Sequence, residues 1–166
     1  MPSGDGDLLS RFQRLGDREA LLAHGRSLSY PEARLRAALD QLQPVFASLS
    51  FGEQPQYGNL DRARLHEHQP EIAFVLRSMA ESKAADLKTA GFHVMGVMDW
   101  QPFIPALQEA LKSGQEWERL EAARALARMS HPEVRVILEA ARPDPEPAVR
   151  NAVREALEKF DRRRAP

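Results

Sequence analysis

The sequence predicts an all-α protein, an α–α superhelix of about three tandem helical hairpins with an N-terminal helical cap. Three observations lead to this fold class. Basic residues recur at Lys88, Arg119 and Arg150, which are spaced 31 residues apart. Apolar residues follow each of these markers at helical spacing, and a proline precedes each predicted hairpin. A constant period of this length is typical of helical repeat proteins, in which each unit buries its apolar face against the next.

Each predicted hairpin begins with a helix that a proline introduces, at Pro70, Pro102 and Pro132. Proline is well tolerated in the first turn of a helix because the N–H that it lacks has no partner there. Apolar residues follow at spacings of three and four, which indicate an amphipathic helix. These residues are Ile72, Val75, Met79, Ile104, Leu107, Leu111, Val134, Ile137 and Ala141.

The second helix of each hairpin is predicted to carry one buried stripe. Positions three, seven and ten residues after each basic marker fall on the same side of a helix. They hold Gly91, Met95, Met98, Ala122, Leu126, Met129, Val153, Leu157 and Phe160.

Helix-capping residues lie six positions before the markers, at Ser82, Ser113 and Asp144. Their side-chain oxygens can accept hydrogen bonds from the free N–H groups of a first helical turn. Pro145 would then occupy the first helical position of the last repeat. The second helices are therefore expected to begin near 83–86, 114–117 and 145–147.

Two of these second-helix segments resemble HEAT-like repeats, including the kind found in phycobilisome lyase subunits. They are residues 119–129, RLEAARALARM, and 149–160, VRNAVREALEKF. The resemblance implies stacked hairpins over residues 70–161. It also implies a ladder between an Asp in the turn of a repeat and an Arg in its second helix, and Asp144 with Arg150 supplies both residues.

The remaining sequence completes the predicted organisation. Ser29 to Glu32 form a capping box that opens a long helix, and Pro44 is expected to end or kink that helix. Gly, Pro, Gln and Asn gather in residues 52–59, which is typical of a loop. The predicted parts are a flexible N-terminus at 1–6, a helical cap at 7–50, a linker at 51–69, repeats at 70–98, 102–129 and 132–160, and a basic tail at 162–166.

Composition excludes several kinds of function. The net charge of −1 gives no general attraction for nucleic acid, so nucleic-acid binding is not expected. The absence of cysteine excludes disulfides, thiolate catalysis and cysteine-ligated metals. No catalytic motif, metal-ligand motif or dinucleotide fingerprint is found, so we expect no enzyme activity, no cofactor, no metal and no small-molecule ligand. No apolar run is long enough to span a membrane, and a cytoplasmic location is the default expectation.

Second helices usually line the concave face of such solenoids, and their outward positions give the candidate partner-binding surface. These positions lie one, five and nine residues after each basic marker. They are Thr89, His93, Val97, Leu120, Arg124, Arg128, Asn151, Glu155 and Lys159. Trp100 and Trp117 are added because tryptophan is enriched where interfaces concentrate their binding energy, although each could equally pack between repeats.

The sequence therefore favours a protein-binding scaffold or regulatory adaptor with no catalytic centre. The mixed charges of the candidate surface suit a protein partner that is recognised by complementary charge. Two alternatives stay open. One is an accessory subunit of an enzyme, such as a bilin-lyase-like complex, and the other is a HEAT-like nucleic-acid-binding protein.

Overall fold

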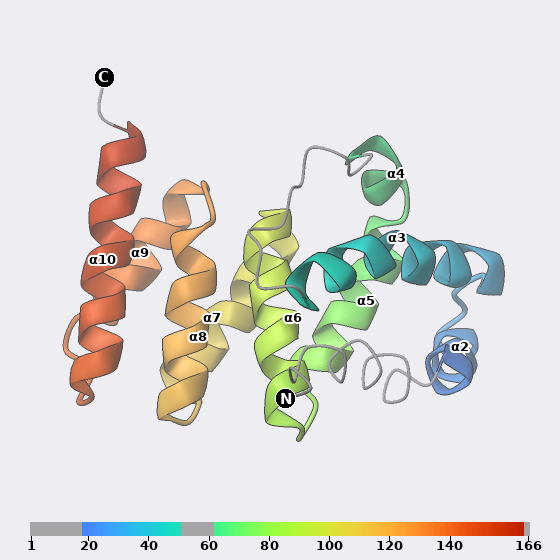
Figure 1. The fold of residues 1–166 in the computed structure, drawn as a ribbon, viewed down its shortest axis with the longest axis horizontal. Helices are drawn as coiled ribbons and strands as arrows, with labels where there is room; N and C mark the ends of the chain where they lie inside the picture. The colour runs from blue at the N-terminus through green and yellow to red at the C-terminus, as the bar shows by residue number, and fades with distance from the viewer. Residues whose placement is uncertain (1–17, 51–61, 165–166) are drawn as a thin grey trace. The chain divides into compact units, whose positions relative to one another are not determined.

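The structure, a computed structural model, describes residues 18–50 and 62–164. Within these ranges the regular structure is helical and no strand is present, which confirms the all-α prediction (Figure 1). The chain divides into two compact units, Met1–Leu87 and Lys88–Pro166. Each unit is described separately below.

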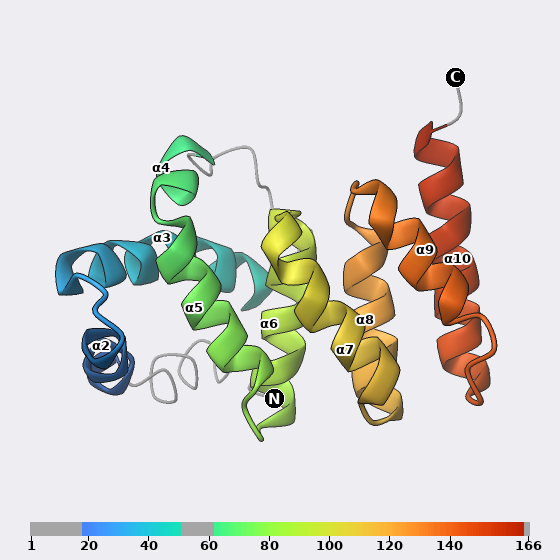
Figure 2. The same cartoon turned by 180° about the vertical axis from the view of Figure 1, so that it is seen from behind.

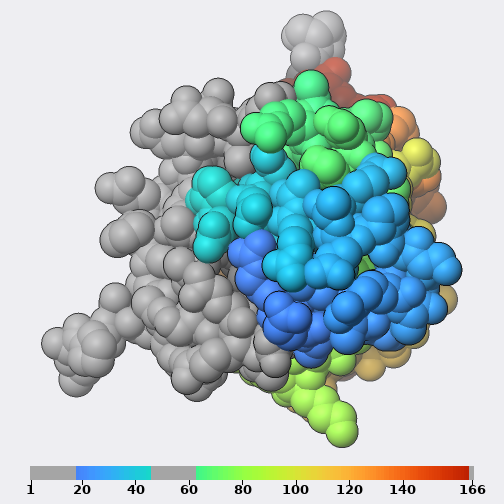
Figure 3. All heavy atoms as spheres, turned by 90° about the vertical axis from the view of Figure 1, so that its right-hand side faces the viewer, coloured from blue at the N-terminus to red at the C-terminus, as the bar shows by residue number. Residues whose placement is uncertain are grey.

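The first unit is built from helices that precede the predicted repeats together with the first helix of repeat one. They are α2 (Arg18–Ser27), α3 (Glu32–Ser50), α4 (Arg62–Glu67) and α5 (Gln69–Ala80). Helix α3 packs against α2, α4 and α5. Figure 3 shows α2 and α3 side by side on one face of this unit.

Helix α3 buries the apolar side that its sequence predicts, since Leu35, Ala38, Leu39 and Leu42 are buried. Pro44 does not end α3, which continues through this residue to Ser50, so of the two predicted outcomes a kink stays a prediction. The predicted short helix around Leu8 to Leu15 lies outside the described residues.

The second unit contains most of the predicted repeat region. Its elements are α6 (Ala85–Met98), which begins just before the unit boundary, the 3₁₀ turn η2 (Gln101–Phe103), α7 (Ile104–Ser113), α8 (Glu116–Ala127), α9 (Pro132–Ala140) and α10 (Pro147–Arg164). Helices α6, α8 and α10 stand next to one another in a row, and α7 and α9 form a second layer behind them (Figures 1 and 2). This arrangement of stacked hairpins is the predicted α–α superhelix.

The predicted stripe forms the core of the second helices. Met95, Leu126 and Leu157 are all buried, and they occupy equivalent positions in successive second helices. In the first helices, Ile104, Leu107, Leu111 and Val134 are buried as well. Met98 and Ile137 are half-buried. The 31-residue period therefore corresponds to layers of apolar side chains that repeat from one hairpin to the next.

The second helices begin where the sequence predicts, but their capping differs. Ser113 was predicted to cap α8, yet its hydroxyl donates back to the carbonyl of Glu109 within α7. Gly114 and Gln115, both with an extended backbone, separate α7 from α8. The Ser113 hydroxyl is therefore too far from the N–H groups in the first turn of α8 to cap that helix. Asp144 does accept a bond from the N–H of Glu146, at 3.0 Å. Helix α10 begins at Pro147 and not at Pro145.

The structure shows two features that the predicted division of the chain into cap, linker and repeats did not include. Helix α4 lies in the segment 51–69 that was predicted as a linker. The unit boundary after Leu87 falls inside the predicted first repeat, 70–98. The borders of the cap, the linker and the three repeats remain predictions.

Candidate binding face on the second helices

Eight of the nine predicted surface positions lie in α6, α8 and α10, and the ninth, Arg128, is the residue that follows the end of α8. Five of them are exposed, and all five lie in α8 and α10 or at the C-cap of α8: Arg124, Arg128, Asn151, Glu155 and Lys159. The other four are half-buried: Thr89, His93, Val97 and Leu120. The accessible part of the predicted surface therefore lies on the last two second helices.

Two of the three basic markers, Lys88 and Arg119, join one repeat to the next. Lys88 on α6 donates to the carboxylate of Glu118 on α8 at 3.0 Å. Arg119 on α8 donates to both carboxylate oxygens of Asp144, at 2.8 and 3.1 Å. The side chains of Arg119 and Asp144 are only 16% and 7% exposed, so water screens this pair little.

The environment of Asp144 favours its charged form. Burial opposes ionisation, but hydrogen bonds from Arg119 and from the N–H of Glu146 outweigh it, so the pKa of Asp144 lies below its ordinary value of 3.8. Arg150 contacts this turn differently from the ladder that the family resemblance implies. Its guanidinium donates to the backbone carbonyls of Asp144 and Pro145, at 2.7 and 2.8 Å. The carboxylate of Asp144 thus pairs with the arginine of the preceding repeat, a partner that the sequence reasoning missed.

Gly96 brings α6 against α8. A Cβ atom at this position would lie 2.6 Å from the carbonyl oxygen and 2.9 Å from the Cα of Ala125. Backbone atoms cannot move aside as the end of a flexible side chain can. Glycine inside the helix therefore allows a close contact between adjacent second helices, although it lowers the helix propensity of α6.

His93 is a half-buried imidazole on α6 whose Nε2 atom is buried and has no hydrogen-bond partner. Burial, together with the positive charge of Arg128, lowers the pKa of His93 to about 4. The ring is therefore neutral at physiological pH. A position predicted to point outward is in fact held partly inside the row of second helices.

Asp99 connects the end of α6 to the start of α9. It adopts a left-handed backbone conformation with φ of 51°. Its carboxylate accepts the backbone N–H of Ser130 at 2.9 Å and the hydroxyl of the same serine at 2.5 Å. His131 Nε2 lies 2.8 Å from the carbonyl oxygen of Asp99. These bonds fix the loop that carries Trp100.

Trp100 lies at the C-terminal end of the second helices and Trp117 at their N-terminal end. Trp100 stacks on Phe103 with ring centroids 5.5 Å apart, next to the loop that Asp99 joins to Ser130. Trp117 lies in the first turn of α8, where its Nε1 donates to Gln115 at 3.1 Å. The 12 residues of α8 separate these ends by about 18 Å. Both rings are half-buried, and they do not form a single aromatic anchor.

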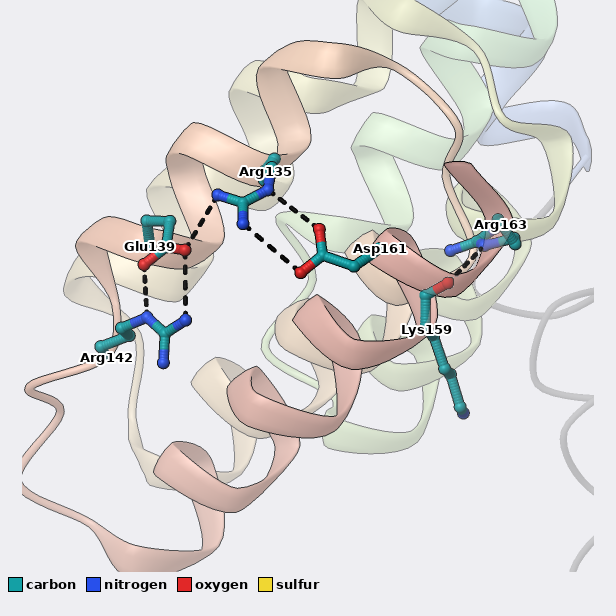
Figure 4. Close-up of polar contacts among 6 residues, drawn as sticks. All are labelled: Arg135, Glu139, Arg142, Lys159, Asp161 and Arg163. Atoms are coloured by element: carbon teal, nitrogen blue, oxygen red, sulfur yellow. Dashed lines mark hydrogen bonds and ion pairs between the residues drawn. The ribbon is translucent and has the colours of Figure 1, made fainter. Parts of the chain in front are cut away.

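Arg163 adds a basic residue that was not among the predicted surface positions. It donates to the backbone carbonyls of Ala127 and Arg128 at the end of α8, and to the carbonyl of Lys159 on its own helix. Figure 4 shows Lys159 and Arg163 together on α10. The sequence signal was the run of arginines at 162–164, which was assigned to a tail and not to α10.

The same figure shows a second polar group between α9 and α10. Arg135 donates to Asp161 at 3.1 and 3.4 Å and also pairs with Glu139, which in turn pairs with Arg142 (Figure 4). Here the arginines are matched by carboxylates. This group joins the two helices of the last repeat and leaves no unmatched cation.

Residues 104–166 match the family model for HEAT repeats. This part of the chain is built from HEAT-like repeats. The match covers α7 to α10, which form two hairpins. It is a match to HEAT repeats in general, so the resemblance to the phycobilisome-lyase kind remains a prediction. No protein of curated description matches the chain significantly.

Among the described helices, none combines the length and the apolar character that crossing a membrane requires.

Proposed function

We propose that the second-helix face of these HEAT repeats binds a partner protein, and that the chain acts as an adaptor or regulatory module. The strongest support is that some polar residues of this region bond between repeats whereas others are exposed to solvent. Arg119 and Asp144 are used internally, to join repeats. Arg124, Arg128, Asn151, Glu155 and Lys159 are exposed on the same two helices.

The repeat architecture supports the same function. Stacked hairpins place equivalent positions of successive helices side by side. Such positions together form an extended surface for binding. The exposed positions combine both signs of charge with a neutral asparagine, as is common at the polar parts of protein interfaces. HEAT repeats are commonly scaffolds for protein interaction, which agrees with this reading.

A pull-down from the native host tests the proposal. The wild-type chain is compared with the double variant Arg124→Glu and Arg128→Glu, which reverses two exposed charges on α8. The matched control is Lys112→Glu with Arg154→Glu, because these two residues are also exposed and helical but lie outside the proposed face.

We expect a partner that the wild type and the control retain and the double variant loses. The partner is then purified, and its binding to the three proteins is measured directly. Equal recovery with all three proteins would remove this face from the binding site. Circular dichroism of each variant shows whether the helical content is unchanged.

A further inference from the structure

His93 lies on the side of α6 that packs against α8. Gly96, three residues later on the same side of the helix, is so close to α8 that a Cβ atom would lie 2.9 Å from the Cα of Ala125. The Nε2 atom of His93 is buried, and no group among the described residues forms a hydrogen bond with it. An unpaired polar atom inside a helix contact is costly, so His93 is a weak point of the contact between α6 and α8.

The charged groups around His93 do not favour a positive ring. Burial lowers the pKa of His93, and the positive charge of Arg128 at the end of α8 lowers it further, to about 4. Asp86 is seven residues away along α6, at a rise of about 10 Å. The other charged groups of α6 and of the neighbouring turns of α8 form pairs, which are Lys88 with Glu118 and Arg124 with Glu121. A proton on His93 would therefore place a second positive charge beside Arg128 inside the contact.

Protonation of His93 is coupled to separation of α6 from α8. In the closed contact the pKa is about 4, and a ring that reaches water regains its ordinary value of 6.5. The open form therefore takes up the proton first as the pH falls. The closed contact has its full stability above pH 6.5 and loses stability progressively as the pH falls toward 4.

We propose that His93 is an acid-sensitive switch, whose protonation opens the contact between α6 and α8 and so weakens binding at the second-helix face. The inference rests on the proposed function and adds regulation to it. Arg124 and Arg128 belong to the exposed part of that face and lie on the α8 side of this contact. Opening of the contact would therefore change the part of the face that α8 contributes.

Amide hydrogen exchange followed by NMR tests the switch on the full chain without a partner. An isolated helix of 14 residues is marginal in water, so the amides of α6 exchange when this helix leaves α8. The rates at pH 7 and at pH 5 are each divided by the intrinsic rate at that pH, which gives the opening equilibrium. Met95 and Gly96 report on α6, and Val153 and Ala156 on α10 are the reference within the same unit.

We expect the opening of α6 to increase about tenfold from pH 7 to pH 5, and that of α10 to increase less than about twofold. His93→Leu and His93→Gln do not titrate in this range, so both should remove the increase in α6. His66→Gln, at an exposed residue of α4, is the control and should retain it. Equal increases in α6 and α10, or an increase that survives both His93 variants, would overturn the inference.

A binding measurement separates the switch from the proposed function. The partner recovered in the pull-down is titrated with the wild type and with His93→Leu, and each affinity at pH 7 is divided by the affinity at pH 5. We expect this ratio to be larger for the wild type by at least about twofold. Equal ratios would overturn regulation by His93 and leave the binding face in place. Failure of the pull-down at neutral pH would remove the face, whereas the exchange measurement reports on α6 and α8 alone.

Discussion

Arg119 and Asp144 form a two-bonded ion pair that joins α8 of one HEAT repeat to the turn of the next. The two residues are 25 positions apart in sequence, and they belong to different hairpins. Their side chains are mostly shielded from solvent. The pair therefore acts as a fixed connection between repeats, and it leaves the neighbouring exposed residues available for a partner.

Replacing Arg119 by glutamine should destabilise the second unit by about 1–2 kcal/mol, because a shielded carboxylate then loses its charged donor. Both tryptophans lie in this unit, so denaturant unfolding followed by tryptophan fluorescence measures the effect. Arg135→Gln is the matched control, since Arg135 also pairs with an aspartate of a neighbouring helix but does so in solvent. A loss for Arg135→Gln as large as that for Arg119→Gln would contradict the distinction between shielded and exposed pairs.

His93 should make the second unit sensitive to mild acid. Its folded pKa of about 4 lies below its ordinary value of 6.5, so the unfolded chain takes up the proton first. The stability associated with the neutral ring is therefore complete above pH 6.5 and is lost progressively as the pH falls toward 4.

The variant His93→Leu tests this prediction, because leucine has no buried nitrogen to leave unpaired. It should be about as stable as the wild type at neutral pH and more stable at a pH between the two pKa values. Melting temperatures across that range give the comparison, and NMR titration gives the pKa of His93 directly. Parallel pH dependence of the two proteins would show that this imidazole is not responsible.

Gly96→Ala should destabilise the protein although alanine is the better helix former. The new methyl group would meet the backbone of Ala125, and overpacking of this kind costs about 1–3 kcal/mol, more than the gain of about 1 kcal/mol in helix propensity. Thr89→Ala on the same helix is the control and should change stability by less than about 0.5 kcal/mol. A stabilising effect of Gly96→Ala would show that α6 and α8 are not in such close contact.

Asp99→Ala should lower stability by about 1–2 kcal/mol, because two hydrogen bonds to the loop before α9 are lost. The change removes the acceptor for the backbone N–H and the hydroxyl of Ser130, and it also places alanine at a positive φ. Asp99→Asn should be milder, because asparagine keeps an acceptor and tolerates this conformation. Urea titration of the three proteins measures the order. Equal losses for the two variants would mean that the charge of Asp99, and not the geometry of its hydrogen bonds to Ser130, determines the stability.

Much of the fold followed from periodic features of the sequence. The offsets from the basic markers located the buried positions Met95, Leu126 and Leu157 because a helical face repeats with fixed spacing. The capping of α8 could not be predicted in the same way. Ser113 has the residue type of an N-cap, but whether a hydroxyl bonds forward or backward depends on where the preceding helix ends.

The candidate site was less accessible to sequence reasoning because it depends on contacts between repeats. A helical wheel gives the direction of His93 from its own helix, but not the depth at which the neighbouring helices cover it. The pairing of Asp144 with Arg119 in place of Arg150 is also a property of the stack. Arg163 was missed because α10 continues to Arg164, beyond Phe160, the last apolar residue of the predicted stripe. No apolar pattern marks this last part of the helix.

Site-directed cross-linking tests the central proposal most directly. The chain contains no cysteine, so a single benzophenone-labelled cysteine can be placed at Glu155, on the proposed face, or at Lys112 on α7 as the control. After irradiation in a lysate of the native host, we predict a discrete protein cross-link from position 155 that is absent from position 112. Cross-linking from position 112 alone, or the same products from both positions, would contradict a partner-binding face on α8 and α10.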